Sequence, residues 1–212
     1  MTNRIAWPIL RRSLVAILRG VRPDEVEGIV GALIEEGFEA IEVPLNSPDP
    51  ISSIEKIAKT FGASCLIGGG TMLSVEDVDR VADVGGKLMV SPNVDPEVIA
   101  RTTERGLVSM PGVFTPSEAL LALKSGASAL KFFPAGALGV AGISAIKPIL
   151  PKDAIIGAVG GVSDISFADY AKIGIRTFGL GSSLYKPGDG VETVRTRAKA
   201  AIQAYDAAFA HE

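Results

Sequence analysis

The sequence has very few of the residues that most often build metal centres and nucleophilic triads. Cys65 is the only cysteine and His211 the only histidine among 212 residues. An internal disulfide and a multi-cysteine metal cluster are therefore excluded. A zinc site built on histidine, or a catalytic Ser-His pair, is improbable for the same reason.

Long apolar runs and a large excess of one charge are also missing. No stretch approaches the roughly 18 apolar residues of a membrane span, and residues 1–12 lack the features of a signal peptide. The net charge is -3, and no basic stretch is interleaved with aromatic residues. We therefore expect a cytoplasmic protein that has neither a nucleic acid nor a membrane as a partner.

The sequence does have 24 glycines and 13 prolines, which separate short apolar runs from helical patterns along the whole chain. The expected strands are 14–19, 40–44, 65–67, 87–91, 107–110, 129–134, 154–159 and 177–180, and residues 68–71 are expected to form a tight turn after the third strand. A helical pattern follows each strand, the one after the sixth strand running from about 139 to 150, and a short amphipathic helix is expected within residues 1–12. Strict alternation with short connections predicts a parallel sheet.

Eight such repeats in about 200 residues favour a single-domain α/β fold, a closed (β/α)8 TIM barrel over residues 1–212. An open doubly wound sheet is disfavoured, because residues 19–22 (Arg-Gly-Val-Arg) after the first strand do not form the G-x-G-x-x-G motif. In a barrel, side chains at the C-terminal ends of the strands converge on one site. The residues at those positions can therefore be considered together.

Lys131 lies in the middle of the sixth predicted strand and shares one face with Ala129 and Phe133. An ammonium group kept among apolar neighbours loses hydration, which lowers its pKa from about 10.4 and favours the neutral, nucleophilic amine. Such a lysine can form a Schiff base. The alternative is an edge-strand lysine whose ammonium group reaches water.

Glu42 is predicted to point into the barrel with Ala40, because the alternating Ile41 and Val43 would face the helices. A buried structural ion pair is one explanation for such a carboxylate. Proton transfer beside an imine is the other, since two opposed titratable groups shift each other's pKa.

Other strand ends carry groups suited to anions. Arg19 and Thr71 could bind a carboxylate, although an ion pair and a helix cap are the respective alternatives. Glycine-rich turns at 160–161 and 181–182 leave backbone N–H groups free after the last two strands, where such barrels often hold phosphate.

Several segments resemble the class I 2-keto-3-deoxy-6-phosphosugar acid aldolases, and the match runs nearly end to end. The segments are 41–48 (Ile-Glu-Val-Pro-Leu-Asn-Ser-Pro), 68–71 (Gly-Gly-Gly-Thr), 91–93 (Ser-Pro-Asn), 130–134 (Leu-Lys-Phe-Phe-Pro), 159–162 (Val-Gly-Gly-Val) and 179–182 (Gly-Leu-Gly-Ser). The family has a gluconate and a galactonate branch. Asn46 stands where the gluconate branch usually has arginine, and Val159 where it usually has threonine, so the chain is most similar to the galactonate branch.

The resemblance implies a reaction and a role for each residue. Lys131 would form the imine and Glu42 would act as general acid-base, while the galactonate-derived acid is cleaved to pyruvate and D-glyceraldehyde 3-phosphate without a metal or other cofactor. The substrate would be bound by Arg19 and Thr71 at its carboxylate, by Pro92 and Phe133 around its pyruvyl part, by Val159 near C4, and by Gly160, Gly161, Gly181 and Ser182 at its phosphate.

The resemblance also implies a homotrimer. The gluconate epimer as main substrate remains an alternative. A more distant one is a non-covalent isomerase or a phosphosugar-binding barrel, in which Lys131 acts only as a point charge.

Overall fold

The computed structural model describes residues 4–210, and its strands form one parallel nine-stranded sheet. The strands are β1 (Leu14–Ile17), β2 (Ala40–Pro44), β3 (Leu66–Gly70), β4 (Leu88–Val90), β5 (Val108–Met110), β6 (Gly112–Val113), β7 (Leu130–Phe132), β8 (Ile156–Val159) and β9 (Thr177–Leu180). Their order in the sheet is β5-β4-β3-β2-β1-β9-β8-β7-β6. Consecutive strands therefore pair with each other except β5 and β6, which are the two ends of this order, and β1 pairs with β9.

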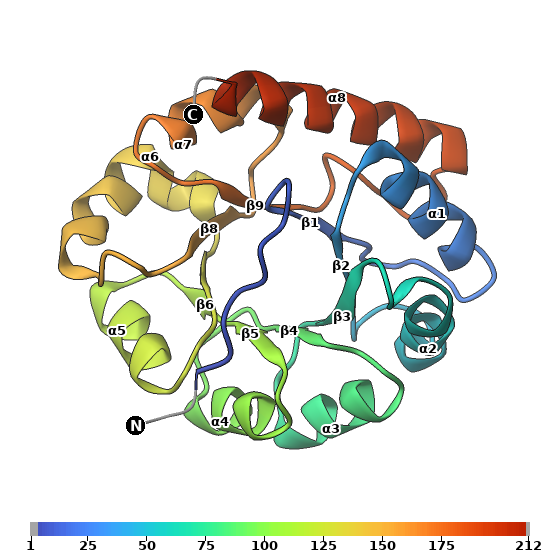
Figure 1. The fold of residues 1–212 in the computed structure, drawn as a ribbon, viewed down its shortest axis with the longest axis horizontal. Helices are drawn as coiled ribbons and strands as arrows, with labels where there is room; N and C mark the ends of the chain where they lie inside the picture. Colours follow the sequence, from blue (N-terminus) through green and yellow to red (C-terminus); the bar gives the residue numbers. More distant parts are fainter. Residues whose placement is uncertain (1–3, 211–212) are drawn as a thin grey trace.

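The barrel closes through a strand that is split in two. Pro111, which has no N–H to donate to a ladder, separates β5 from β6. β5 pairs with β4 and β6 pairs with β7, and the Ser109 carbonyl accepts the N–H groups of Ser128 and Ala129 at 2.9 and 3.1 Å. The fifth predicted strand thus continues to Val113, and the predicted (β/α)8 barrel is confirmed (Figure 1).

Helices surround the ring of strands in Figure 1. They are α1 (Val26–Glu36), α2 (Pro50–Phe61), α3 (Val75–Asp83), α4 (Pro96–Glu104), α5 (Pro116–Lys124), α6 (Ala135–Ile146), α7 (Phe167–Ala171) and α8 (Val191–Phe209), with short 3-10 turns at Lys147–Ile149 and Asp164–Ser166. Local signals fix several starts; at α5, Thr115 and Glu118 form a capping box in front of Pro116. α6 differs from the prediction, because it starts directly after Pro134, and Gly139 is a kink inside it (φ 70°, ψ 167°). No helix within residues 4–210 is long and apolar enough to cross a membrane.

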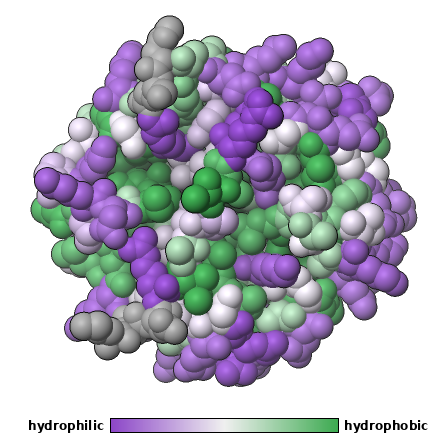
Figure 2. Space-filling view, in the orientation of Figure 1, coloured by the Kyte–Doolittle hydropathy of each residue, from purple (hydrophilic) through white to green (hydrophobic). Residues whose placement is uncertain are grey.

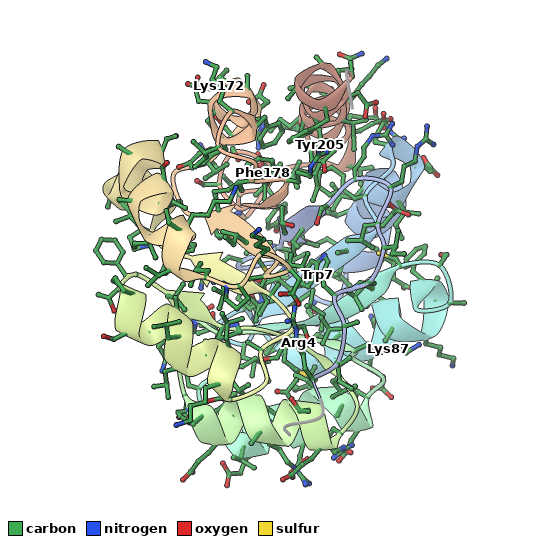
Figure 3. All side chains as sticks on the ribbon, turned by 60° about the vertical axis from the view of Figure 1, so that its left-hand side comes forward. Arg4, Trp7, Lys87, Lys172, Phe178 and Tyr205 are labelled. Atoms are coloured by element: carbon green, nitrogen blue, oxygen red, sulfur yellow. The ribbon has the colours of Figure 1, made fainter. Side chains whose placement is uncertain are left out.

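The N-terminal amphipathic helix predicted within residues 1–12 is wrong for residues 4–12, which are not helical. Pro8 interrupts this stretch, and Trp7 Nε1 donates a hydrogen bond to Ser13 Oγ instead of the chain forming a helical turn. Ile5, Trp7 and Leu10 pack against the apolar side chains inside the barrel. The apolar spacing therefore reflects an extended segment that crosses the end of the barrel where the strands begin (Figures 1 and 3).

Figure 2 shows this face, with hydrophilic residues over most of its rim and apolar residues toward its middle. The opposite end of the barrel, where the strands finish, holds the candidate site.

Side chains of the strands alternate between two cores, as the period of two predicts. Ile41 and Val43 belong to the core between the sheet and the helices, where Phe178 and Tyr205 also meet with ring centroids 6.2 Å apart (Figure 3). Ala40 belongs to the smaller core inside the barrel. The predicted inward direction of Glu42 is thereby confirmed.

Candidate active site

A cavity of about 650 Å³ opens at the end of the barrel where the strands finish. Every residue that the sequence predicted for the site lies on its wall: Arg19, Glu42, Thr71, Pro92, Lys131, Phe133, Val159, Gly160, Gly161, Gly181 and Ser182. The barrel therefore brings together side chains that are far apart in sequence. Their individual roles stay predictions.

Lys131 projects into the barrel from β7, which is paired on both sides. Its register partners are Gly112 on β6 and Gly157 on β8, so neither neighbour adds a side chain beside it. Lys131 is 6% exposed, and its Nζ lies 4.7 Å from the centroid of the Phe133 ring. An edge-strand lysine that reaches water is thus excluded. Burial lowers the pKa of Lys131, and Arg19 lowers it further, against the raising effect of Glu42.

Glu42 is 2% exposed on β2. Its Oε2 atom has no hydrogen-bond partner among residues 4–210. Burial raises the pKa of Glu42 from 4.5 to about 7, while the positive charges of Lys131 and Arg19 act in the opposite direction. A carboxyl group with a pKa near neutrality can both accept and return a proton at physiological pH.

The sequence predicts a tight turn at 68–71, but β3 continues to Gly70 because this stretch pairs with β2 and β4. Two residues at the end of β3 shape the surroundings of the Glu42 carboxyl group. A Cβ atom on Gly70 would lie 1.7 Å from Glu42 Oε2, so only glycine leaves room for the carboxylate. The next residue, Thr71, has φ 57°, a left-handed conformation that is unusual for a β-branched residue. Such strain costs on the order of 1–3 kcal/mol and is characteristic of functional sites.

Arg19 is exposed at the rim, and its Nη1 donates to Asn46 Oδ1 at 2.5 Å. The prediction used Asn46 only as a mark of the galactonate branch. The structure adds a contact that orients the Arg19 guanidinium group.

The glycine turns after β8 and β9 form the other end of the cavity. Gly160 and Gly161 have φ values of 83° and 76°, which glycine adopts without a steric penalty. Within the described chain, the N–H groups of Gly161, Gly181 and Ser182 have no hydrogen-bond acceptor. Free N–H groups of this kind can bind an anion.

Sequence reasoning missed part of the cavity wall. The additional lining residues are Ile17, Gly20, Val162, Ser163, Gly179, Ser183, Tyr185, Lys186 and Pro187. Most of them flank predicted site residues. The last three lie three to five residues after Ser182, and this proximity to the predicted turn was the available signal. Within residues 4–210 there is no group of three or more His, Cys, Asp or Glu side chains that could hold a metal ion.

The raised pKa of Glu42 predicts a pH dependence of stability. In the folded protein this carboxyl group keeps its proton up to about pH 7, whereas its ordinary pKa is 4.5. The folded state therefore binds more protons in this window, so the contribution of Glu42 to stability is complete below pH 4.5 and is lost as the pH rises through 7. The variant Glu42→Gln should gain stability relative to the wild type between pH 5 and pH 8. The gain should reach about 3 kcal/mol, because one pKa unit corresponds to about 1.4 kcal/mol.

Urea unfolding of both proteins at several pH values measures this difference. In the variant, the carboxylate no longer raises the pKa of Lys131, so that pKa falls further. A lowered lysine pKa makes stability increase with pH, so this change adds to the expected gain of the variant at higher pH. A pH-independent difference would show that the Glu42 carboxyl group is ionised in the folded protein throughout this range.

The site can be compared with known proteins. The family model for KDPG and KHG aldolase matches residues 8–195. The chain is 62% identical over 207 residues to a probable 2-dehydro-3-deoxy-6-phosphogalactonate aldolase of Rhizobium meliloti, covering 98% of each chain. It is 46% identical to the 2-dehydro-3-deoxy-6-phosphogalactonate aldolase of Escherichia coli, covering 91% of this chain and 94% of that one.

A solved structure described as native KDPGal superimposes with a TM-score of 0.94 at 44% identity, covering 97% of this chain and 99% of that one. The family match covers most of the sequence, and the similarity extends to the architecture that carries the cavity. The chain belongs to the KDPG and KHG aldolase family, whose members are carbon-carbon lyases.

Proposed function

We propose that this protein is a Schiff-base aldolase that cleaves 2-dehydro-3-deoxy-6-phosphogalactonate to pyruvate and D-glyceraldehyde 3-phosphate. The observation that carries the proposal is the pair of inward side chains in one cavity. Lys131 is a buried lysine with a lowered pKa, and Glu42 is a buried carboxyl group with a pKa of about 7. The names of the similar aldolases from Rhizobium meliloti and Escherichia coli support the choice of substrate.

The reaction begins with attack of the neutral Lys131 Nζ on the C2 carbonyl carbon of the substrate. The carbonyl oxygen takes one proton from the attacking amine and one from the Glu42 carboxyl group and leaves as water, and the resulting iminium ion withdraws electrons from C3. Glu42 then takes the proton of the C4 hydroxyl group, C4 becomes an aldehyde, and the electron pair of the C3–C4 bond moves into an enamine. Glu42 returns a proton to C3, and water hydrolyses the new iminium ion to release pyruvate and the free amine.

The surroundings of Lys131 suit both the attack on the carbonyl group and the iminium ion that results from it. Burial lowers the pKa of Lys131, which favours the neutral amine that makes the attack. The Phe133 ring beside Nζ can stabilise the positive charge of the iminium ion once it has formed. Arg19 and Thr71 line the same cavity and are proposed to hold the substrate carboxylate.

Trapping of the imine tests the role of Lys131. Incubation with pyruvate and borohydride should add one reduced pyruvyl group to the intact protein, and peptide mapping should place it on Lys131. The variant Lys131→Arg keeps the positive charge and should give no adduct, because a guanidinium group stays protonated. If the wild type gave no adduct under conditions that trap other imines, Lys131 would act only as a charge, as in a non-covalent isomerase or binding barrel.

Hydrogen exchange into pyruvate tests the role of Glu42. The variant Glu42→Gln should still form the imine with pyruvate, but it should exchange the methyl protons with solvent on the order of 100-fold more slowly, because an amide cannot accept the proton. Nuclear magnetic resonance in deuterated water measures the exchange. Exchange at the wild-type rate would assign proton transfer to another group.

The choice between the two epimers can be measured directly. They differ only at C4, and a buried hydrogen bond worth about 1–3 kcal/mol permits roughly a 10- to 100-fold preference rather than exclusion. Val159 is 4% exposed on the cavity wall and offers no hydroxyl group to C4. We expect a higher kcat/KM for the galactonate epimer, with measurable activity on the gluconate epimer, when pyruvate release from each pure epimer is followed with lactate dehydrogenase.

The variant Val159→Thr has nearly the same shape and adds a hydroxyl group. Its relative activity on the gluconate epimer should rise if position 159 addresses C4. An unchanged ratio would make Val159 a packing residue, and a wild-type preference for the gluconate epimer would overturn the choice of branch while leaving the aldolase mechanism intact.

We also propose that the protein acts in the cytoplasm as a homotrimer. Leu73, Phe114, Leu120 and Leu121 are large apolar side chains that are exposed in the single chain, as residues of a subunit interface would be. Sedimentation of a stable monomer or dimer at micromolar concentration would contradict the trimer.

A further inference from the structure

The loop from Gly181 to Gly190, between β9 and α8, carries a second lysine that lines the cavity. Lys186 lies on the cavity wall together with Tyr185 and Pro187. It is exposed, whereas Tyr185 is buried. None of the proposed catalytic steps uses Lys186, so its position requires a separate explanation.

The backbone around Lys186 is held on both sides. The Tyr185 N–H donates to the Gly181 carbonyl at 2.9 Å, which closes a tight turn over residues 181–185. This turn contains the predicted phosphate-binding residues Gly181 and Ser182. The Tyr185 hydroxyl donates to Glu25 Oε1 at 3.0 Å. Pro187 packs directly on Gly20, where a Cβ atom would lie 2.6 Å from Pro187 Cγ. The loop therefore fixes where the Lys186 side chain starts.

The ammonium group of Lys186 is available to a ligand. Its Nζ makes no hydrogen bond or ion pair with any residue from 4 to 210. The nearby Asp189 carboxylate already accepts the Lys186 N–H at 2.7 Å and the Arg197 guanidinium at 2.5 Å. The Arg197 hydrogen bond lowers the pKa of Asp189 most, and the charge of Lys186 lowers it further, although no hydrogen bond or ion pair joins the two side chains.

The predicted phosphate-binding groups lack a full positive charge. Gly161 and Gly181 supply N–H dipoles, and Ser182 adds an N–H and a hydroxyl group, but a phosphate monoester carries about -1.5 to -2 charges at pH 7. Of the other cations on the wall, Arg19 is bound to Asn46 and Lys131 is the proposed nucleophile. Lys186 belongs to the same loop as Gly181 and Ser182 and lies one turn beyond them.

We propose that Lys186 is the cationic ligand of the substrate phosphate. The inference rests on the proposed function, because it takes the phosphosugar acid as substrate. The ammonium group forms a charge-assisted hydrogen bond with a phosphate oxygen, and the free N–H groups of the two glycine turns bind the others. The phosphate-binding site then extends from the turn after β8 across the loop that follows β9.

Binding of sn-glycerol 3-phosphate, measured by calorimetry, tests this inference without catalysis. The variant Lys186→Met should weaken binding roughly 10- to 100-fold, the effect of removing one charged hydrogen-bond partner. Lys186→Arg should retain most of the affinity. The control Lys199→Met removes the same charge from an exposed lysine of α8 that does not line the cavity, and it should bind like the wild type.

Trapping with pyruvate and borohydride separates this inference from the proposed function, because pyruvate carries no phosphate. Lys186→Met should trap pyruvate as the wild type does, while its KM for the phosphorylated substrate rises.

Three calorimetric results would overturn the role of Lys186. They are an unchanged affinity of Lys186→Met for glycerol 3-phosphate, no binding by the wild type, and an equal loss of affinity in Lys199→Met. An affinity loss accompanied by lost trapping would also overturn it, since the damage would not be specific to phosphate. Failure of the wild type to trap pyruvate would instead contradict the aldolase proposal, and the calorimetric comparison would still decide whether Lys186 binds phosphate.

Discussion

Removal of two opposed titratable groups from water is the constraint on which the rest of the site depends. Lys131 and Glu42 each lose hydration inside the barrel, and this loss favours the neutral form of both. Their opposite charges shift each pKa back toward its ordinary value, so the effect of burial is only partly expressed. A lysine with a lowered pKa and a carboxyl group with a pKa of about 7 follow from burial opposed by mutual attraction, and the proposed imine chemistry needs both.

The barrel meets this constraint by leaving space where side chains would otherwise meet. Glycines lie at both register partners of Lys131, and Gly70 lies against the Glu42 carboxylate. The extended segment with Trp7 packs across the opposite end of the barrel, so the inner core is apolar below the site and open above it. The glycines near the two charged groups are therefore part of the active-site architecture as much as the charged groups themselves.

The fold and most of the candidate site could be predicted because the underlying rules are local or periodic. Alternation along a strand gave the inward direction of Glu42 and Lys131, and the barrel topology placed the strand ends in one cavity. The N-terminal segment was mispredicted because Ile5, Ile9 and Leu10 have a spacing that also fits a helix, and Pro8 decides against it. Loop 181–190 has no periodicity, so the position of Lys186 depends on tertiary contacts with Glu25 and Gly20 that sequence patterns do not encode.

The two ends of the cavity place opposite demands on the protein, and the fold separates them by element type. The proposed imine end needs a lysine whose neutral form is favoured, and a paired strand supplies it by burying Lys131 between glycines. The proposed phosphate end needs a positive charge near the backbone N–H groups, and the loop after β9 supplies it with the exposed Lys186. The two lysines on one cavity wall thus have different surroundings, because Lys131 is buried and Lys186 is exposed. A strand thus provides the desolvated amine and a loop provides the exposed one, so the connection after β9 has a part in the proposed site as well as in the fold.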